Sequence, residues 1–182
     1  MMKLRFALLL PVVVFMSACS TYTTPRYSSH ADTHVTLKAI GPMAVTIGPV
    51  EEPADFSASC RAAGLLSGPD GMTHAAYIRK ALEDEIKFAG GSLGASPQRM
   101  ISGRLNRLEF SSTKGVTGGA WDIDLTLISS NGNSLNAIEH YEFESGFAAI
   151  TACKQTAEAF FPAVQNLIFK AVSSPGFRPL LQ

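Results

Sequence analysis

Residues 121–144 read WDIDLTLISSNGNSLNAIEHYEFE and decide the fold. The first half alternates apolar with polar side chains from Trp121 to Leu127, and a period of two is typical of a strand with one buried face. Asn131-Gly132 follows and is the strongest short hairpin signal in the chain, because a type I′ turn needs two residues that tolerate positive φ. The second half alternates again, so the stretch predicts an antiparallel hairpin. We expect Tyr141, Phe143 and Phe147 on the apolar side of its second strand.

The segment before this hairpin predicts a third strand. Apolar and polar residues alternate from Ile101 to Asn106, and the apolar positions then shift to Leu108 and Phe110. Such a shift indicates a β-bulge, which we place near Asn106 or Arg107. A Gly-rich turn at residues 114–119 joins this strand to the next, so the three strands form a meander.

Two amphipathic helices flank the meander. Thr73 precedes apolar residues at three- and four-residue steps that stop at Gly90-Gly91, which predicts a helix between them. A second helix is predicted from Thr151 to a stop at residues 174–176. Pro162 lies inside it, so we expect either a kink there or a well-packed part that starts near that residue. A β-rich run at residues 43–50 predicts one more strand ahead of the first helix.

These elements predict an α+β fold. It is a two-layer sandwich in the order strand-helix-strand-strand-strand-helix, with a mixed sheet and both helices on one face. The other sheet face is then wet or bound to another molecule. The expected common core consists of Ile78, Leu82, Ile86, Leu105, Trp121, Ile123, Leu125, Tyr141, Phe143, Val164, Leu167 and Ile168.

The first 18 residues have the order of an export signal. Lys3 and Arg5 precede an apolar run that extends to Met16, and the small residues Ser17 and Ala18 close it. The run is too short to cross a bilayer comfortably, since a spanning helix needs about 20 apolar residues. We therefore expect residues 1–18 to be a removable signal peptide.

Met16-Ser17-Ala18-Cys19 resembles the lipobox of bacterial lipoproteins. The resemblance implies that Cys19 is acylated on its sulfur, becomes the new N-terminus and is acylated again. Met16 is apolar where an ordinary secretory cleavage site has a small residue, which disfavours simple secretion with Cys19 left free. Ser20 follows where Asp would resemble an inner-membrane retention signal. The resemblance therefore implies the outer membrane of a Gram-negative bacterium, with the domain facing the periplasm.

The cysteine count agrees with a lipid anchor. Three cysteines are odd for an oxidising compartment, and acylation of Cys19 leaves Cys60 and Cys153 as an even pair that can form one disulfide. Two alternatives stay open: a pair of buried free thiols, or a nucleophilic cysteine with a bystander.

Composition indicates the limits of the domain and excludes one class of partner. Residues 19–36 are rich in Ser, Thr and Tyr without an apolar period and predict a flexible tether, which leaves residues 37–182 as one α+β domain. The chain has 15 basic and 15 acidic residues, and the loss of Lys3 and Arg5 with the signal leaves a slight negative excess. The basic residues form no stripe that could bind phosphates, so we expect no nucleic-acid partner.

The sequence offers little chemistry. Asp122 and Asp124 lie two apart on a strand, which puts both on its solvated face. His140, Glu142 and Glu144 add similar groups on the next strand and could bind a divalent ion if the two strands pair in register. The sequence contains no nucleophile elbow, P-loop or dinucleotide-binding fingerprint. We expect no enzymatic activity, no cofactor and no resident metal.

The order of these features resembles a known family. The signal with Cys19, the helix from Tyr77 to Ala89 ending in Gly90, the meander around residues 131–132 and the closing helix look like the YajG-type outer-membrane lipoproteins. The chain also resembles, in outline, the lipopolysaccharide-assembly lipoprotein that lies inside an outer-membrane barrel. The resemblance implies a non-enzymatic role in the cell envelope.

Three functions remain open. The first is an accessory lipoprotein that binds an envelope protein in outer-membrane assembly or maintenance, through the polar sheet face or an edge strand. The second is a module that binds a small apolar or lipid ligand between helices and sheet, with Phe160, Phe161 and Phe169 as walls. The third is a hydrolase of envelope polymers, which needs a cleft where carboxylates or Ser and His converge.

Overall fold

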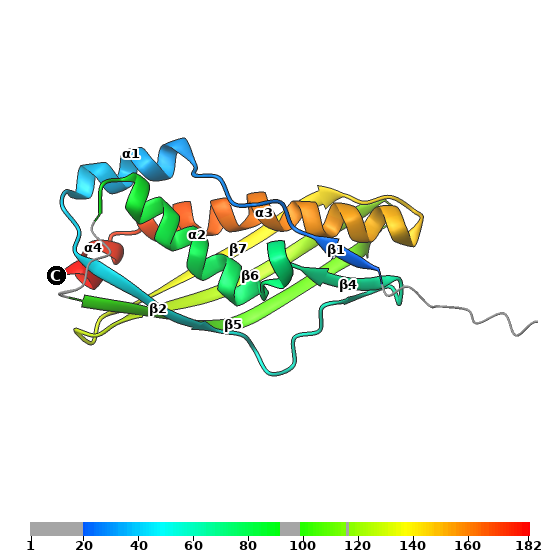
Figure 1. Cartoon of the computed structure of the whole chain (residues 1–182), viewed down its shortest axis with the longest axis horizontal. Coiled ribbons are helices and arrows are strands. Elements are labelled where there is room, and N and C mark those ends of the chain that lie inside the picture. Colours follow the sequence, from blue (N-terminus) through cyan, green and yellow to red (C-terminus); the bar gives the residue numbers. More distant parts are fainter. Residues whose placement is uncertain (1–19, 92–98, 116) are drawn as a thin grey trace, which may run out of the picture.

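The computed structural model describes residues 20–91, 99–115 and 117–182. Its centre is a four-stranded sheet in the order β2-β5-β6-β7. These strands are Val45–Glu51, Arg99–Lys114, Gly118–Ser129 and Ser134–Glu144. β2 and β5 are parallel, and the other neighbours are antiparallel. Helices α2 (His74–Phe88) and α3 (Ala149–Ser173) lie on one face of this sheet (Figure 1). The predicted α+β class is confirmed, and the predicted order of strand, helix, three strands and helix holds for this sheet and these two helices.

Helix α2 connects the parallel pair β2 and β5, since parallel neighbours need a crossover. It begins where the sequence predicts, because the Thr73 hydroxyl caps the first turn by accepting from Ala76 N at 3.1 Å. It ends at Phe88, shortly before Gly90 takes a φ of +87°. Glycine adopts such a φ at little cost. The two signals that bound the helix in the sequence therefore act at its two ends.

The meander also follows the predicted register. The pairing of β5 with β6 shifts between Leu105 and Arg107, which is the predicted bulge. The β6–β7 hairpin turns at Asn131-Gly132, where Gly132 has a φ of +91°. The Asn131 side-chain amide donates to Pro179 O at 2.8 Å. This bond ties the turn to the C-terminal helix α4 (Phe177–Leu181).

The core fills the space between sheet and helices. Trp121 is fully buried, and its ring centroid lies 4.6 Å from that of Phe160 on α3. Its indole N–H donates to Thr156 O at 2.8 Å. Ten of the twelve predicted core residues are buried, and Tyr141 and Phe143 are half-buried against the same cluster. The two hydrophobic periodicities of the sequence therefore identify the core correctly.

Two expectations about the second half of the chain are wrong: that the well-packed part of the closing helix starts near Pro162, and that Phe147 lies on the second strand of the hairpin. Helix α3 runs through Pro162 and buries Cys153 and Phe160 ahead of it. Burial on both sides of the proline outweighs the one hydrogen bond that it removes. Strand β7 ends at Glu144, because its partner Gly118 is the first residue of β6. Phe147 therefore lies in the loop to α3, exposed over 84% of its surface.

The predicted tether is wrong over residues 20–36. Thr21–Thr23 forms strand β1, parallel to β4 (Gly64–Ser67), and Ala31–Ile40 forms helix α1. Between them the Tyr27 hydroxyl donates to the Glu85 carboxylate at 2.6 Å. The Ser-, Thr- and Tyr-rich composition is typical of linkers. In this fold, however, the aromatic side chains and hydrogen bonds of the segment hold it against α2 and α3. Cys19, the first residue of that predicted tether, lies outside the described residues.

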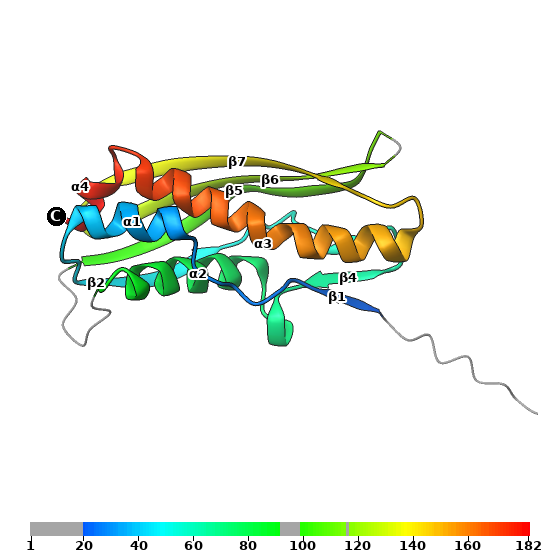
Figure 2. The same cartoon turned by 90° about the horizontal axis from the view of Figure 1, so that it is seen from above.

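A small sheet in the order β1-β4-β3 completes the fold, with β3 at Ser59–Cys60. A short 3₁₀ helix, η1 (Pro69–Gly71), leads from β4 towards α2. The molecule is elongated (Figures 1 and 2). The start of β1, the β3–β4 turn and the β7–α3 loop lie near one end, and α4 with the C-terminus lies at the other.

Candidate interaction surface

The sheet face opposite α2 and α3 carries the polar side chains predicted for it. Apart from the buried Ala120, the even-numbered residues of β6 and β7 are exposed or half-buried along this face, and most of their odd-numbered neighbours are more deeply buried on the helix side. The register places Thr126 beside Asn136 and Asp122 beside His140. These side chains form two hydrogen-bonded networks.

The first network surrounds Asp124. Its Oδ1 accepts from the side-chain amides of Asn106 and Asn136, at 2.8 Å and 2.5 Å. Asn106 also donates to Thr126 Oγ1 at 2.8 Å, and Asn106 Oδ1 accepts from Arg104 Nε at 3.2 Å. Asn106 occupies the bulge position of β5, which leaves it unpaired in the register with β6. The bulge therefore places an amide next to Asp124.

The second network surrounds His140. Asp122 Oδ1 lies 2.8 Å from His140 Nδ1 and accepts from Arg107 at 3.1 Å. His140 Nε2 lies 3.1 Å from Glu142 Oε1, which also pairs with Lys114. The hydrogen bonds to Asp122 and then to Glu142 raise the pKa of His140. The bond from Lys114, followed by that from His140, lowers the pKa of Glu142. Charges of both signs are thus fixed on an exposed surface.

The predicted carboxylates divide between the two networks. Asp122 and Asp124 share the outer face, as the alternation predicts, but they contact different partners. Glu144 is exposed at the last position of β7. Within residues 20–91, 99–115 and 117–182, no group of three or more His, Cys, Asp or Glu side chains could hold a metal ion.

Part of β5 has an edge without a strand partner. β2 pairs with β5 only as far as Glu51 opposite Arg104. Among the described residues, the backbone of 106–111, here called the β5 edge, pairs with β6 alone. A cavity of about 280 Å³ lies beside it, under the loop after β2. Pro53 and Phe56 of that loop line the cavity together with Leu108 and Phe110 of β5.

Phe56 separates this cavity from a second one. The second cavity measures about 450 Å³, and its lining includes Phe56, Leu66, Met72 and His74. The ring of Phe56 lies edge-on to His74, with 5.1 Å between the centroids. His74 is only 3% exposed, and burial lowers its pKa to about 4 against the opposing influence of Glu52. This second cavity is therefore mainly apolar with a neutral imidazole in its wall.

The phenylalanines predicted as ligand walls pack against other aromatic rings. Phe160 contacts Trp121 in the core, and Phe161 lies 6.0 Å from the ring of Tyr27. Phe169 lies 5.9 Å from the ring of His30. All three therefore belong to the packing between α3 and its neighbours.

The structure joins Cys60 and Cys153 by a disulfide with a Cα–Cα distance of 5.8 Å. Both residues are fully buried, and the bond links β3 to α3. With both sulfurs in the disulfide, neither cysteine can act as a free thiol nucleophile. The predicted acylation site Cys19 lies outside the described residues. None of the described helices is long and apolar enough to span a membrane.

The sequence analysis did not predict two charged side chains that tertiary hydrogen bonds hold in place. Glu85 is fully buried and accepts from Tyr27 Oη and from His30 N at 2.7 Å. Arg61 donates to Ser112 Oγ and to Phe147 O, each at 2.9 Å. Glu85 interrupts the apolar side of α2, which is a signal for a buried carboxylate. Arg61 lies in a loop, where the sequence gives no such signal.

Comparison with known proteins informs the fold alone. No family model matches the chain, and no curated protein does. A Xanthomonas campestris protein of the DUF330 family is similar in structure, with a TM-score of 0.53 and 9% identity over 84% of this chain and 95% of that one. An uncharacterized protein has a TM-score of 0.45 at 11% identity, covering 82% and 97% of the two chains. A candidate lipoprotein from Caulobacter crescentus has a TM-score of 0.41 at 12% identity, covering 78% and 90%. The chain therefore shares the fold of the DUF330 protein, and the likeness is not to the YajG type in particular.

Proposed function

We propose that the chain is a lipid-anchored accessory protein of the cell envelope that binds a protein partner and has no catalytic role. The anchor rests on the order of charges, apolar run and small residues before Cys19. Two or more acyl chains hold a protein far better than one, because each buried methylene contributes about 0.8 kcal/mol. We place the anchor in the outer membrane and the domain in the periplasm, on the resemblance of Ser20 and its neighbours to lipoprotein signals.

Acylation of Cys19 is tested by mass spectrometry of the protein extracted from membranes. We expect a mature N-terminus at Cys19 that carries the acyl groups, and a Cys19→Ala variant that leaves the membrane fraction. A mature N-terminus elsewhere, or membrane retention of that variant, would contradict the anchor.

The β5 edge is the observation that carries the binding role. An unpaired edge presents backbone N–H and C=O groups that another extended chain can pair with. The adjacent cavity of about 280 Å³, lined by Phe56, Leu108 and Phe110, offers a place for side chains of such a chain. Backbone pairing would supply affinity, and the cavity would supply selectivity.

The two polar networks extend this surface across the sheet. Arg107 belongs to the β5 edge and Arg104 comes just before it, with Asp122 and Asp124 on the neighbouring strand. Charges of both signs favour one register and orientation of a partner and disfavour pairing with the wrong chain. The same charges discourage pairing between two copies of the edge.

Site-specific photo-crosslinking in cells tests the proposed docking surface. A photoreactive residue at Glu109, on the β5 edge, should form a covalent adduct with an envelope protein. The matched control is Glu158, a half-exposed glutamate on α3 away from the sheet. Adducts that form equally from both positions, or from Glu158 only, would overturn the β5 edge as the binding site.

A second function is favoured by the cavity of about 450 Å³ beside His74. Its apolar wall of Phe56, Leu66 and Met72 suits a small apolar or lipid ligand. Native mass spectrometry of protein released from the membrane by mild detergent should then show a bound small molecule. A Leu65→Trp variant, which enlarges a 54% exposed residue of the cavity wall, should lose it.

A further inference from the structure

Two large apolar side chains are exposed in and beside the loop between β7 and α3. Phe147 is 84% exposed, and Ile150 in the first turn of α3 is 70% exposed. Single exposed apolar residues are common and need no explanation. These two are informative because they lie at the end of the molecule where the proposed lipid anchor joins the domain.

The fold begins directly after the predicted acylation site. Ser20 is exposed, and its carbonyl accepts from Leu65 N at 3.0 Å. Thr21 already pairs with Leu65 in strand β1. An extended chain spans at most about 3.3–3.6 Å per residue, so β1 starts within about 7 Å of the Cα of Cys19. No tether of useful length separates the folded part from the lipid.

The β3–β4 turn lies against this starting point. A Cβ placed on Gly64 would lie 2.1 Å from Ser20 O, so only glycine allows such a close approach of the two backbones. In the same turn Arg61 and Ala62 have φ values of +47° and +51°. Such angles are uncommon for residues other than glycine, and tertiary contacts must hold them.

Those contacts lead to the exposed loop. The Arg61 guanidinium donates to Phe147 O at 2.9 Å and to both oxygens of Ser112. The adjacent Cys60 is bonded to Cys153, one turn after Ile150 on α3. The start of β1 and the β7–α3 loop are thus fixed at the same end of the molecule, as both views show (Figures 1 and 2).

We infer that this end of the domain rests on the lipid bilayer and that Phe147 and Ile150 insert into its interfacial layer. The inference depends on the proposed acylation of Cys19. Phe and other large apolar side chains of membrane-surface segments lie at the boundary between headgroups and acyl chains. Lys154, one turn after Ile150, has a 71% exposed side chain and lies 3.8 Å from the Glu158 carboxylate. An exposed pair of this kind is weak, so the ammonium can turn to lipid phosphates, which attract it. The long axis of the molecule then points away from the membrane, and α4 lies at the far end (Figure 2).

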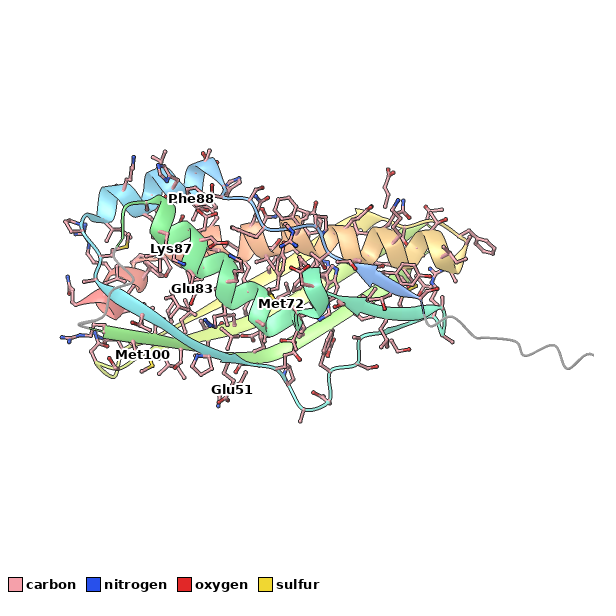
Figure 3. All side chains as sticks on the ribbon, in the orientation of Figure 1. Glu51, Met72, Glu83, Lys87, Phe88 and Met100 are labelled. Carbon is pink, nitrogen blue, oxygen red and sulfur yellow. A yellow bond between two sulfur atoms is a disulfide. The ribbon has the colours of Figure 1, made fainter. Side chains whose placement is uncertain are left out.

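Depth-dependent fluorescence quenching tests this orientation. The acylated mature protein is reconstituted into vesicles of phosphatidylethanolamine and phosphatidylglycerol, with and without bromine on the acyl chains. Phe147→Trp adds a reporter at the proposed contact, and the native Trp121 stays buried as a constant background. Phe88→Trp is the matched control, because Phe88 is also a phenylalanine, is 62% exposed and lies at the end of α2 away from β1 (Figure 3).

We expect vesicles of either lipid to shift the emission of Phe147→Trp to shorter wavelength and brominated lipid to quench it, with neither change in Phe88→Trp. Equal quenching of both variants, or an emission shift in Phe147→Trp without quenching by brominated lipid, overturns the membrane contact. The second result would indicate cover by protein. Mass spectrometry of the same samples separates the two proposals. A chain without acyl groups defeats the anchor and the orientation together, whereas an acylated, vesicle-bound protein without quenching defeats the orientation alone.

Discussion

Burial of a single imidazole links the stability of this fold to pH. His74 is 3% exposed between Phe56, Trp121 and Phe160, and burial lowers its pKa to about 4. The unfolded chain binds a proton near pH 6.5, so the unfolded state gains protons first as the pH falls. The contribution of neutral His74 to the free energy of unfolding is fully present above about pH 6.5 and decreases as the pH falls to about 4. We expect a loss of about 2 kcal/mol between about pH 7 and pH 5.

Urea unfolding at the two pH values measures this loss. A His74→Phe variant should lose less stability on acidification than the wild type by that amount. The control is His140→Gln, because His140 is exposed on the other sheet face and its pKa is raised by Asp122. That replacement should leave the loss in place. An equal decline in the wild type and His74→Phe would show that His74 is protonated in the folded state.

Leu125 tests the core at the same scale. It is 2% exposed on the helix side of β6. Leu125→Ala should lower the free energy of unfolding by about 2–5 kcal/mol, through lost burial and the cavity left behind. Ile138→Ala on the outer face is the control, since Ile138 is 52% exposed and a surface change usually alters stability by less than about 0.5 kcal/mol. Similar values for the two variants in urea unfolding would place Leu125 outside the core.

Residues whose role depends on periodicity could be predicted from the sequence, and residues whose role depends on tertiary contact could not. Alternation put Asp122 and Asp124 on the outer face, and the shift after Leu105 located the bulge. The contact between Asn106 in the bulge and Asp124 depends on how β5 pairs with β6, and no local sequence pattern encodes that pairing. Phe56 likewise borders the two cavities only because the loop after β2 folds back beside His74.

At the scale of elements, the Cys60–Cys153 bond should be the strongest covalent contribution to stability. It closes a loop of 93 residues between β3 and α3. In the chain-entropy account, such a closure contributes about 4–5 kcal/mol by restricting the unfolded chain. Reduction under denaturing conditions, followed by refolding with thiols blocked, should lower the melting temperature markedly. A melting temperature unchanged by reduction would mean that the bond adds no net stability.

The elements that the sequence predicted are those with a complete local signal. α2 has a cap, a stripe and a glycine stop, and the β6–β7 hairpin has Asn131-Gly132 between alternating runs. The elements that it missed, β1, α1, β3, β4, η1 and α4, are short or weakly amphipathic and gain their stability from neighbours. β1 exists only as the partner of β4, and a strand of three residues leaves no recognisable period.

For the whole molecule, the N-terminal segment determines how anchor and domain are connected. Residues 20–40 cross α2 and α3, with Thr24 and Leu37 buried and Tyr27 and His30 bonded to Glu85. Tyr27→Phe would keep the ring beside Glu85 and remove the hydroxyl that donates to its buried carboxylate. Loss of a hydrogen-bond donor to a buried group costs about 1–3 kcal/mol, so we expect a loss of this size in urea unfolding. Adding Glu85→Gln to Tyr27→Phe should recover part of it, because a neutral amide is less costly to bury.

An insertion separates the two roles of residues 20–40, which are to stabilise the fold and to hold the domain close to the anchor. About ten Gly and Ser residues placed between Cys19 and Ser20 keep every contact of residues 20–40 and add a flexible linker of roughly 15–20 Å mean reach. Stability should therefore stay unchanged, whereas the quenching of Phe147→Trp by brominated lipid should weaken. A loss of stability on insertion would contradict the view that the fold begins at Ser20. If quenching persisted, the exposed side chains would bind the bilayer by their own affinity, and the short connection to Cys19 would not be what orients the molecule.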